Sequence, residues 1–352
     1  MRAAFDRVLT SGRYIMGPEV DGLEAEVAEF TGAAHAIGVS SGTDALLCSL
    51  MALGIGRGDE VICPTYTFFA TAGTIWRTGA KPVFVDVDPA TYNTDAERIA
   101  AAITERTRVI MPVHLFGQCC DMGPIVELAS QKGIRVIEDA AQAIGAKCGD
   151  RGAGSMGDFG CFSFFPSKNL GCLGDGGIIT TNDADLAEEA RIMRIHGGKP
   201  KYHHKVVGGN FRLDPLQAAM VRVRLPRLPA ETERRRANAA RYEELFHAAG
   251  IVSGDPVDVP SDKIGLPVKV QPSHIYNQFV IRVGGGRREA LRAALGQHGI
   301  GNEVYYPIPM HLQECFAELG HSRGDFPVAE RAAEETLALP IFASLTDDEL
   351  QY

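Results

Sequence analysis

The sequence lacks the features that mark membrane and secreted proteins. No apolar run approaches the length of a membrane-spanning helix, and the N-terminal residues contain no charged-then-apolar signal segment. The eight cysteines form no CxxC pair and follow no spacing typical of a disulfide scaffold. These absences predict a reduced, cytoplasmic protein whose cysteines are small core residues, with no metal site and no membrane partner.

Positive charge is also scarce. The 35 Lys and Arg residues are outnumbered by 44 Asp and Glu residues, which gives a formal net charge of -9. A nucleic acid is therefore not an expected partner. An anionic small molecule would need a local basic pocket that works against this overall field.

The 352 residues, 45% of them hydrophobic, suffice for one large core and a smaller second domain. Apolar runs alternate with helical patterns through the first two-thirds of the chain. The expected strands are HAIGVS (35–40), EVICP (60–64), KPVFVDVD (81–88), RVIMPVHL (108–115), RVIEDA (135–140), FGCFSFF (159–165) and GGIITT (176–181). Such strands, separated by helices, predict an α/β fold with a mostly parallel sheet covered on both faces.

The composition changes after about Leu225. The segment PRLPAETERRRANAARYEELFHAAG (226–250) predicts a long, charged helix that links two domains. It is followed by an expected strand at NQFVIRV (277–283), a helix over 287–298 and the segment NEVYYPIPM (302–310). We therefore expect a large domain over 1–225 and a smaller C-terminal α+β domain over 226–352.

The segment SSGTDALL (40–47) follows an expected strand and opens a helix. The free backbone N–H groups at such a helix start, together with the hydroxyl of Thr43 next to Gly42, suit a phosphate group. An ordinary Ser/Thr helix cap explains the same pattern, so this segment alone does not decide between the two.

Asp139 ends the expected strand in VIEDAAQ (136–142). Open α/β sheets present ligand-binding groups at the carboxyl ends of their strands, and a carboxylate there can keep a pyridine nitrogen protonated. Gln142 is near enough to reach a ring substituent. The alternative is that Asp139 caps a helix over AAQAIG (140–145).

Lys168 follows the apolar strand in FSFFPSKNLG (162–171). Enclosure disfavours the charge of a lysine, lowers its pKa and makes its amine nucleophilic toward an aldehyde. Ser163 adds a hydroxyl that can bind phosphate. The alternative is a solvated surface lysine, which the apolar approach strand disfavours.

In this order along the chain, SGTDAL, TYTFFAT, VIEDAAQ, FSFFPSKNLG, GDGG, GGNFRLDPLQAA, YYPIPMHLQ and GDFPVAE resemble the DegT-type nucleotide-sugar aminotransferases. The resemblance runs essentially end to end. It implies the three-layer sandwich of pyridoxal-phosphate enzymes of fold type I. It also implies an amino-sugar transaminase that alternates between pyridoxal 5′-phosphate and pyridoxamine phosphate.

Site roles follow from the resemblance residue by residue. It implies that Lys168 carries the cofactor as a Schiff base and later moves the proton, and that Asp139 pairs with the ring nitrogen. The remaining expected cofactor contacts are Gln142 at the ring hydroxyl, Phe68 on the ring face, Gly42, Thr43 and Ser163 at the phosphate, and Asn210 reaching the phosphate of the neighbouring subunit. The expected substrate contacts are Arg212, Tyr305, Tyr306 and His311.

The resemblance also implies the partners and the substrates. Asn210 and Arg212 would cross between subunits, so an obligate homodimer with shared active sites is expected. The amino donor would be L-glutamate, and the acceptor a keto-sugar nucleotide. Local likeness at YPIPMHLQ and GDFPVAE favours a UDP- or dTDP-3-keto-hexose, with a 4-keto sugar nucleotide as the alternative.

Three other functions compete with this interpretation. A dehydratase on the same scaffold carries histidine at the lysine position, and Lys168 speaks against it. A nicotinamide dehydrogenase is disfavoured because Gly54-Ile-Gly56-Arg-Gly58 follows an expected helix and precedes a strand, the reverse of a dinucleotide-binding motif. A non-catalytic regulatory protein on the same fold stays possible from sequence, although the lysine, aspartate and phosphate set disfavours it.

Overall fold

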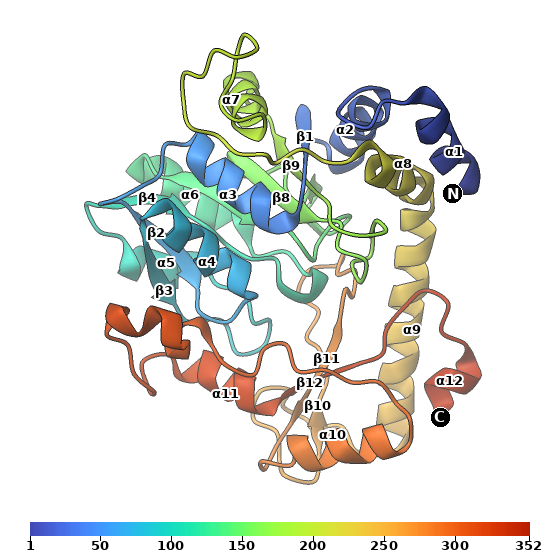
Figure 1. Ribbon diagram of the computed structural model, residues 1–352. Helices are drawn as coiled ribbons and strands as arrows, with labels where there is room; N and C mark the ends of the chain where they lie inside the picture. The colour runs from blue at the N-terminus through green and yellow to red at the C-terminus, as the bar shows by residue number, and fades with distance from the viewer.

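The computed structural model describes all residues from Met1 to Tyr352. Its main sheet has seven strands in the order β1-β9-β8-β5-β4-β2-β3 (Figure 1). Their bounds are β1 His35–Val39, β2 Glu60–Pro64, β3 Lys81–Val85, β4 Thr107–Ile110, β5 Arg135–Asp139, β8 Phe159–Ser163 and β9 Gly177–Thr181. All seven coincide with runs expected from the sequence. The central strand β5 pairs with β4 on one side and with β8 on the other.

One strand runs against the others. β9 pairs antiparallel with both β1 and β8, whereas the pairs β2–β3, β2–β4, β4–β5 and β5–β8 are parallel. The residues just before β9 therefore reach the same edge of the sheet as the carboxyl ends of the parallel strands. This reversal brings the GDGG segment (174–177) to the edge where a parallel sheet binds its ligands.

Helices cover both faces of this sheet, which makes three layers (Figure 1). One face packs against α3 (Gly42–Ala52), α4 (Phe69–Thr78) and α7 (Ala184–Arg194). The other packs against α2 (Pro18–Thr31), α5 (Ala96–Ala102), α6 (Met122–Lys132) and α8 (Pro215–Arg224). Successive strand residues alternate between the two cores, as Ala36 and Ile37 do in β1, because side chains alternate across a strand.

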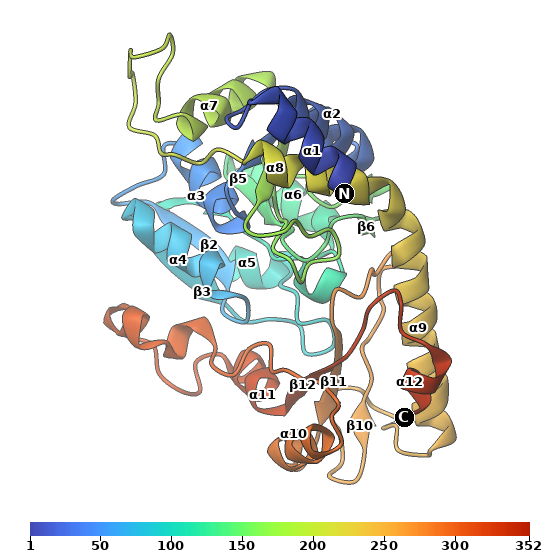
Figure 2. The same ribbon diagram turned by 45° about the vertical axis from the view of Figure 1, so that its right-hand side comes forward.

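The C-terminal part is built around a second, antiparallel sheet, β10-β11-β12. Its strands are β10 Ile264–Gly265, β11 Phe279–Val283 and β12 Thr336–Leu339, and its helices are α9 Leu228–Ala248, α10 Arg288–Gln297 and α11 Pro327–Glu335. Figures 1 and 2 both show α9 running from α8, beside the main sheet, down to this smaller sheet. The remaining elements are α1 Arg2–Ser11, η1 Leu115–Gly117, β6 Lys147–Cys148, β7 Arg151–Gly152, η2 Leu225–Arg227, η3 Met310–Leu312, η4 Glu314–Leu319 and α12 Asp347–Gln351.

The predicted fold class is confirmed: an α/β three-layer sandwich with a mostly parallel sheet, together with a smaller C-terminal α+β part. The predicted domain boundary at 225/226 falls inside η2, between α8 and α9, and it stays a prediction. The helix considered for residues 140–145 is not formed, so Asp139 caps no helix. None of the helices combines the length and apolar character needed to cross a membrane.

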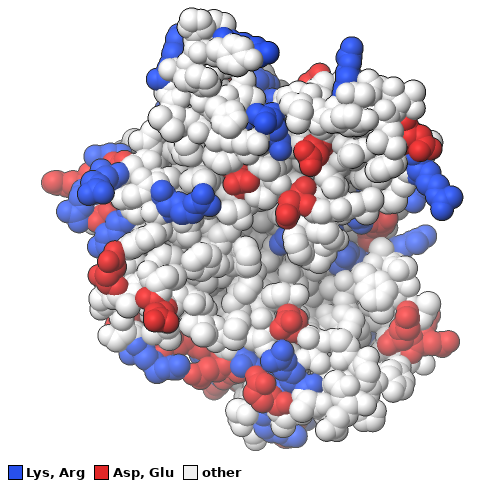
Figure 3. All heavy atoms as spheres, viewed as in Figure 1, with Lys and Arg blue, Asp and Glu red and all other residues white.

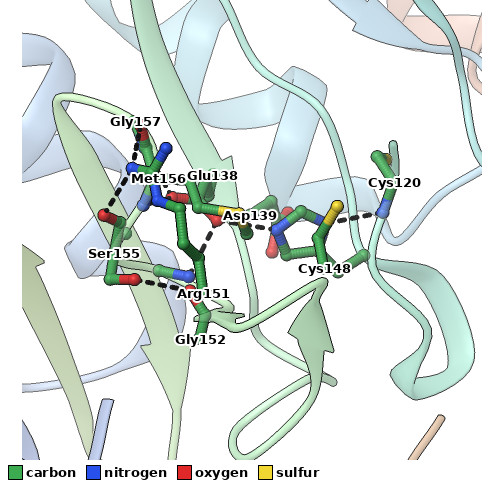
Figure 4. Close-up of polar contacts among 12 residues, drawn as sticks. Cys120, Glu138, Asp139, Cys148, Arg151, Gly152, Ser155, Met156 and Gly157 are labelled. Atoms are coloured by element: carbon green, nitrogen blue, oxygen red, sulfur yellow. Dashed lines mark hydrogen bonds and ion pairs between the residues drawn. The ribbon is translucent and has the colours of Figure 1, made fainter. Parts of the chain in front are cut away.

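A buried polar cluster on the side chain of Glu138 holds the loop before β8 against β5 (Figure 4). Oε1 of Glu138 accepts the N–H groups of Met156 and Gly157, both at 2.7 Å. Oε2 accepts the Gly154 N–H at 2.8 Å and lies 2.8 Å from Nε2 of His114. Because Nδ1 of His114 accepts the Cys120 N–H at 3.1 Å, the ring proton is on Nε2 and donates to Glu138.

Glu138 is therefore a buried anion that is held entirely by donors. Burial opposes its ionisation, but hydrogen bonds from His114 and from the backbone N–H groups of Gly157 and Gly154 lower the pKa of the carboxyl below its ordinary value. The next residue, Asp139, points to the opposite face of the sheet, as alternate residues of a strand do. The cluster thus fixes β5 from behind the site that Asp139 faces.

We predict that Glu138→Gln lowers the free energy of unfolding by about 2–4 kcal/mol. The amide nitrogen of glutamine accepts no hydrogen bond, so at least one buried N–H loses its acceptor. Urea unfolding of the variant beside Glu97→Gln, a change at an exposed glutamate, measures the effect. Equal stability of the two variants would contradict the anchoring role of Glu138.

Candidate active site

A cavity of about 470 Å³ lies at the carboxyl ends of the parallel strands. This volume is in the range of small-molecule sites. Nine residues selected from the sequence line it: Gly42, Thr43, Phe68, Asp139, Gln142, Ser163, Lys168, Tyr305 and Tyr306. Seven of them lie at or just after the ends of four strands of the main sheet, β1, β2, β5 and β8, and the two tyrosines complete the wall from the C-terminal part. The fold thus brings together positions more than 250 residues apart in the chain.

The N-terminus of α3 forms one end of the cavity. Ser41 caps the helix: its hydroxyl accepts the Asp44 N–H at 3.0 Å, and its carbonyl accepts the Ala45 N–H at 2.9 Å. The first-turn N–H groups of Gly42 and Thr43 are left available to a ligand. The cap and the phosphate interpretation of this segment are therefore compatible, because the capping residue is Ser41 rather than Thr43.

Close packing requires glycine at the start of α3. A Cβ atom on Gly42 would lie 2.6 Å from Cβ of Ser163, at the end of β8. A Cβ atom on Gly177 would lie 2.5 Å from the carbonyl oxygen of Ser41. The helix terminus can therefore approach β8 and β9 only because both positions lack a side chain. The result is a backbone cradle beside the Ser163 hydroxyl.

Asp139 is 5% exposed and presents its carboxylate to the cavity. Oδ2 accepts the Thr71 hydroxyl at 2.8 Å, and Oδ1 accepts the Ala141 N–H at 3.2 Å. Burial raises the pKa of Asp139 above its ordinary value, although Thr71, Ala141 and the charge of Lys168 oppose the shift. A cation bound next to this carboxylate would supply the charge that favours its ionised form.

Lys168 lies in the turn after β8, and its amide donates to the Phe165 carbonyl at 2.8 Å. The residue is partly exposed through the cavity, yet its amine is enclosed by protein. Burial lowers the pKa of Lys168 to about 8, against the attraction of Asp139, which raises it. The solvated-lysine interpretation is thus excluded by position, and the amine is partly uncharged near neutral pH.

Gln142 and Tyr306 form a polar link on the cavity wall. Oε1 of Gln142 accepts the Phe116 N–H at 2.7 Å, which turns its amide nitrogen toward the Tyr306 hydroxyl at 3.1 Å. Burial raises the pKa of Tyr306 far above its ordinary value, so its hydroxyl stays protonated. The ring of Phe68 lies 5.9 Å from that of Tyr306, and Phe68 itself is 55% exposed.

A hydrogen bond from Tyr66 holds the backbone of the Tyr305–Tyr306 pair in place. The Tyr66 hydroxyl donates to the Tyr305 carbonyl at 2.6 Å and lies 2.8 Å from the Thr336 hydroxyl of β12. Tyr66 is fully buried and belongs to the loop after β2. The wall built by Tyr305 and Tyr306 is therefore set by a contact between the main sheet and the C-terminal sheet.

Three expected site residues do not line this cavity. His311 is 2% exposed, and its ring nitrogens lie 2.8 Å from the Thr65 hydroxyl and 3.1 Å from Glu330, so both are already occupied. Asn210 is exposed, beside the end of α7. Arg212 pairs with Val39 through its backbone, and its buried Nε has no hydrogen-bond partner.

The cavity also contains residues that the sequence did not single out, among them Ser41, Thr67, Asp175, Ser167 and Gln278. Asp175 belongs to the GDGG segment and reaches the cavity because β9 is reversed. Gln278 is the residue just before β11. The quoted segments SSGTDAL, TYTFFAT and GDGG contain the first three of these, but a local pattern does not tell which side chain points inward.

Segment 195–209 projects beyond α7 in Figures 1 and 2 and contains Lys199, Lys201 and Lys205. Basic side chains are visible over this projection in Figure 3. No group of three or more His, Cys, Asp or Glu side chains is arranged to hold a metal ion, in this segment or elsewhere.

The whole chain, residues 1–352, matches the model of the DegT/DnrJ/EryC1/StrS aminotransferase family. A pleiotropic regulatory protein of Geobacillus stearothermophilus is 49% identical, covering 99% of this chain and 90% of its own. The UDP-N-acetyl-3-dehydro-alpha-D-glucosamine 3-aminotransferase of Acidithiobacillus ferrooxidans is 46% identical, covering 98% of this chain and 89% of its own. Relatives with different names thus share nearly the full length of the sequence.

Solved structures show the same likeness. The crystal structure of S. venezuelae DesV in complex with a ketimine intermediate superposes with a TM-score of 0.92 at 43% identity, covering 99% of this chain and 91% of that one. NtdA from Bacillus subtilis with bound cofactor PMP gives a TM-score of 0.88 at 32% identity, covering 99% and 78%. By its sequence and its fold, this chain belongs to the DegT/DnrJ/EryC1/StrS aminotransferase family, as the ordered motifs predicted.

Proposed function

We propose that this protein is a pyridoxal-phosphate-dependent transaminase that moves an amino group from L-glutamate to a 3-keto sugar nucleotide. The observation that carries the proposal is the pairing of Lys168 and Asp139 in one enclosed cavity next to a free helix N-terminus. An amine of lowered pKa, a buried carboxylate and an anion site are the three groups that this cofactor needs.

Lys168 is proposed to hold the cofactor covalently through its Nζ. A pKa of about 8 leaves part of the amine uncharged near neutral pH, and the uncharged amine is the nucleophile. When an amino acid takes its place, the freed Nζ is positioned to move the proton of the α-carbon. Bound pyridoxal phosphate would supply a ring that withdraws electrons from the C–H bond at the α-carbon of the amino acid.

Asp139 is proposed to pair with the ring nitrogen and keep it protonated. The fit is supported by the carboxylate itself: it is buried, burial raises its pKa, and a positive ring nitrogen beside it would favour its ionised form. Phe68 would contact the face of the ring. Gln142, whose amide group is held by the Phe116 N–H, would contact the hydroxyl group of the ring. Asp139, Phe68 and Gln142 line one cavity together with Lys168, as expected for a flat aromatic ligand.

The phosphate is proposed to bind in the backbone cradle at the start of α3. The N–H groups of Gly42 and Thr43, the Thr43 hydroxyl and the Ser163 hydroxyl converge there. A helix N-terminus favours an anion because its N–H groups are unpaired and its dipole is positive. The net charge of -9 does not oppose this binding strongly, since the donors are local.

The sugar is proposed to lie against Tyr305 and Tyr306. Both line the cavity from the C-terminal part, and Tyr306 keeps its hydroxyl proton for donation. His311 is not part of this proposal, because its two nitrogens are occupied by Thr65 and Glu330. The 3-keto position rests on the local likeness of YPIPMHLQ and on the 3-aminotransferase relative, and the proposed nucleotide carrier is UDP or dTDP.

We also propose a homodimer with shared sites, in which Asn210 and Arg212 complete the cavity of the partner. Neither residue lines the cavity of its own chain, and the buried Nε of Arg212 lacks a partner. Phe165 and Leu173, on either side of Lys168, are 51% and 65% exposed. Apolar side chains exposed beside a site favour a protein interface.

A regulatory role is the second candidate. It is favoured by one observation, the 49% identical relative that is named a pleiotropic regulatory protein. The intact lysine, carboxylate and anion site argue for catalysis, because a purely regulatory protein has no need of a nucleophilic amine. Turnover separates the two candidates.

The first prediction from the proposed function concerns Lys168→Ala. The variant should lose the visible absorbance of the bound cofactor and covalent trapping by borohydride, with turnover at least roughly a hundredfold lower. Spectra of the protein loaded with pyridoxal phosphate measure this, with Lys147→Ala, a change at an exposed lysine, as the control. An unchanged band in Lys168→Ala would mean that another lysine carries the cofactor.

The second prediction concerns the substrate. Given L-glutamate and a panel of 3-keto and 4-keto UDP- and dTDP-sugars, the protein should release 2-oxoglutarate with a 3-keto sugar. Turnover with 4-keto sugars alone would overturn the 3-keto assignment. Release with none of them would contradict the transaminase proposal and favour the regulatory candidate.

The third prediction concerns the shared site. Lys168→Ala and the double variant Asn210→Ala, Arg212→Ala should each be weakly active, and their mixture should regain about a quarter of wild-type activity. Random exchange makes half of the dimers mixed, and each mixed dimer has one intact site of two.

The matched control for this experiment mixes Lys168→Ala with Asp139→Asn. Both changes lie in the cavity of a single chain, so their mixed dimers contain no intact site and should regain nothing. Equal recovery in the two mixtures, or recovery in neither, would refute the shared site.

A further inference from the structure

Thr71 differs from the other threonines of helix α4. Thr74 donates its hydroxyl to the Thr71 carbonyl at 3.2 Å, and Thr78 donates to the Ile75 carbonyl at 2.7 Å, each within the helix. The Thr71 hydroxyl leaves the helix and donates to Oδ2 of Asp139, on β5, at 2.8 Å. Helical threonines commonly bond to the preceding turn, so this contact between two elements is a product of the tertiary structure.

The direction of the hydrogen bonds around Thr71 follows from the chemistry of its partners. An ionised carboxylate has no proton to give, so the single hydroxyl proton of Thr71 goes to Asp139. The Thr67 hydroxyl, 2.9 Å from that of Thr71, must then be the donor in the second bond. Thr67 and Thr71 are 1% and 0% exposed, so water does not compete for these bonds. The chain Thr67, Thr71, Asp139 runs in one direction and ends at the carboxylate.

Several ionisable groups surround Asp139 closely enough to interact with its charge: Lys168 after β8, Cys63 on β2, Cys161 on β8 and Tyr306 from the C-terminal part on its own side, and His114 after β4 from the opposite face of the sheet. Burial is the main influence on Asp139 and raises its pKa. The Thr71 hydroxyl is the strongest of the influences that lower it, ahead of the Ala141 N–H and Lys168. The thiols and the phenol are neutral at physiological pH, because burial raises the pKa of each.

From this geometry we infer that Thr71 is a positioning residue for the reaction. Its hydroxyl holds the Asp139 carboxylate in one orientation and stabilises its negative charge. It thereby sustains the positive ring nitrogen with which that carboxylate pairs. Thr67 keeps Thr71 in the donor role. This inference rests on the proposed pyridoxal-phosphate function and assigns a task to two hydroxyl groups to which that function by itself gives none.

The test compares Thr71→Val with Thr74→Val. Valine has the shape of threonine but lacks the hydroxyl, and both positions are buried on the same helix. Only the first change removes a donor from Asp139. Without the Thr71 hydroxyl, the Asp139 carboxylate binds a proton more tightly and keeps the ring nitrogen protonated less well. The positive ring normally repels a proton at the Lys168 nitrogen, so a weaker ring charge lets that nitrogen keep its proton to higher pH. Thr71→Val should therefore raise the pH midpoint of the visible absorbance of the loaded protein by about one unit.

Two further measurements accompany the midpoint. The single-turnover half-reaction with L-glutamate should be roughly tenfold slower in Thr71→Val, the factor expected when a hydrogen bond to a charged group is lost. Titration of pyridoxal phosphate into the cofactor-free variant should show weaker binding. Thr74→Val should keep the wild-type midpoint and rate. Thr71→Ser, which retains the hydroxyl, should restore both.

The inference is overturned if Thr71→Val keeps the wild-type midpoint and rate, or if Thr71→Val and Thr74→Val shift alike, since that marks a packing effect of α4. If Thr71→Val does not fold, Thr71→Ser and Thr71→Ala decide, because they differ by one hydroxyl; equal midpoints would refute the role. Failure of the proposed function looks different: the wild-type protein itself would then give no visible band with pyridoxal phosphate.

Discussion

Asp139 ends β5 with its carboxylate buried, and burial by itself would favour the protonated, neutral form. The surrounding elements oppose this. Helix α4 contributes the Thr71 hydroxyl, the following turn contributes the Ala141 N–H, and the loop after β8 contributes the amine of Lys168. The same enclosure that raises the pKa of the Asp139 carboxyl lowers the pKa of the Lys168 amine. The raised pKa of the Asp139 carboxyl and the lowered pKa of the Lys168 amine thus have one cause, burial in the same cavity.

Two neighbouring acidic residues of β5 have different environments because successive side chains of a strand point to opposite faces of the sheet. Glu138 points to the face covered by α2, α5, α6 and α8, where four donors saturate it. Asp139 points to the cavity, where lone pairs are left for a ligand. Glu138 holds β5 in place, and Asp139, as the next residue of that strand, is thereby held at the cavity. A shift of one residue in register would exchange them and would destroy both arrangements.

The C-terminal part contributes the wall of the cavity through buried contacts with the main sheet. Tyr66 joins the loop after β2 to Tyr305 and to Thr336 of β12. His311 does the same between Thr65 and Glu330 of α11. A histidine expected at the substrate therefore acts as a link between the two parts. The proposed sugar contacts depend on these links, since Tyr305 and Tyr306 belong to no helix or strand.

The sequence by itself determined the seven strands, the fold class, the family and nine residues that line the cavity. Apolar runs, helix starts and ordered motifs are local signals, and one chain contains them whether or not it is folded. Only the tertiary structure decided that β9 is reversed and brings Asp175 to the cavity, that no helix follows Asp139, that His311 is occupied, and that Thr71 donates to Asp139. These facts depend on which elements become neighbours. Side-chain direction and hydrogen-bond partners are set by packing across the chain, and no local pattern encodes them.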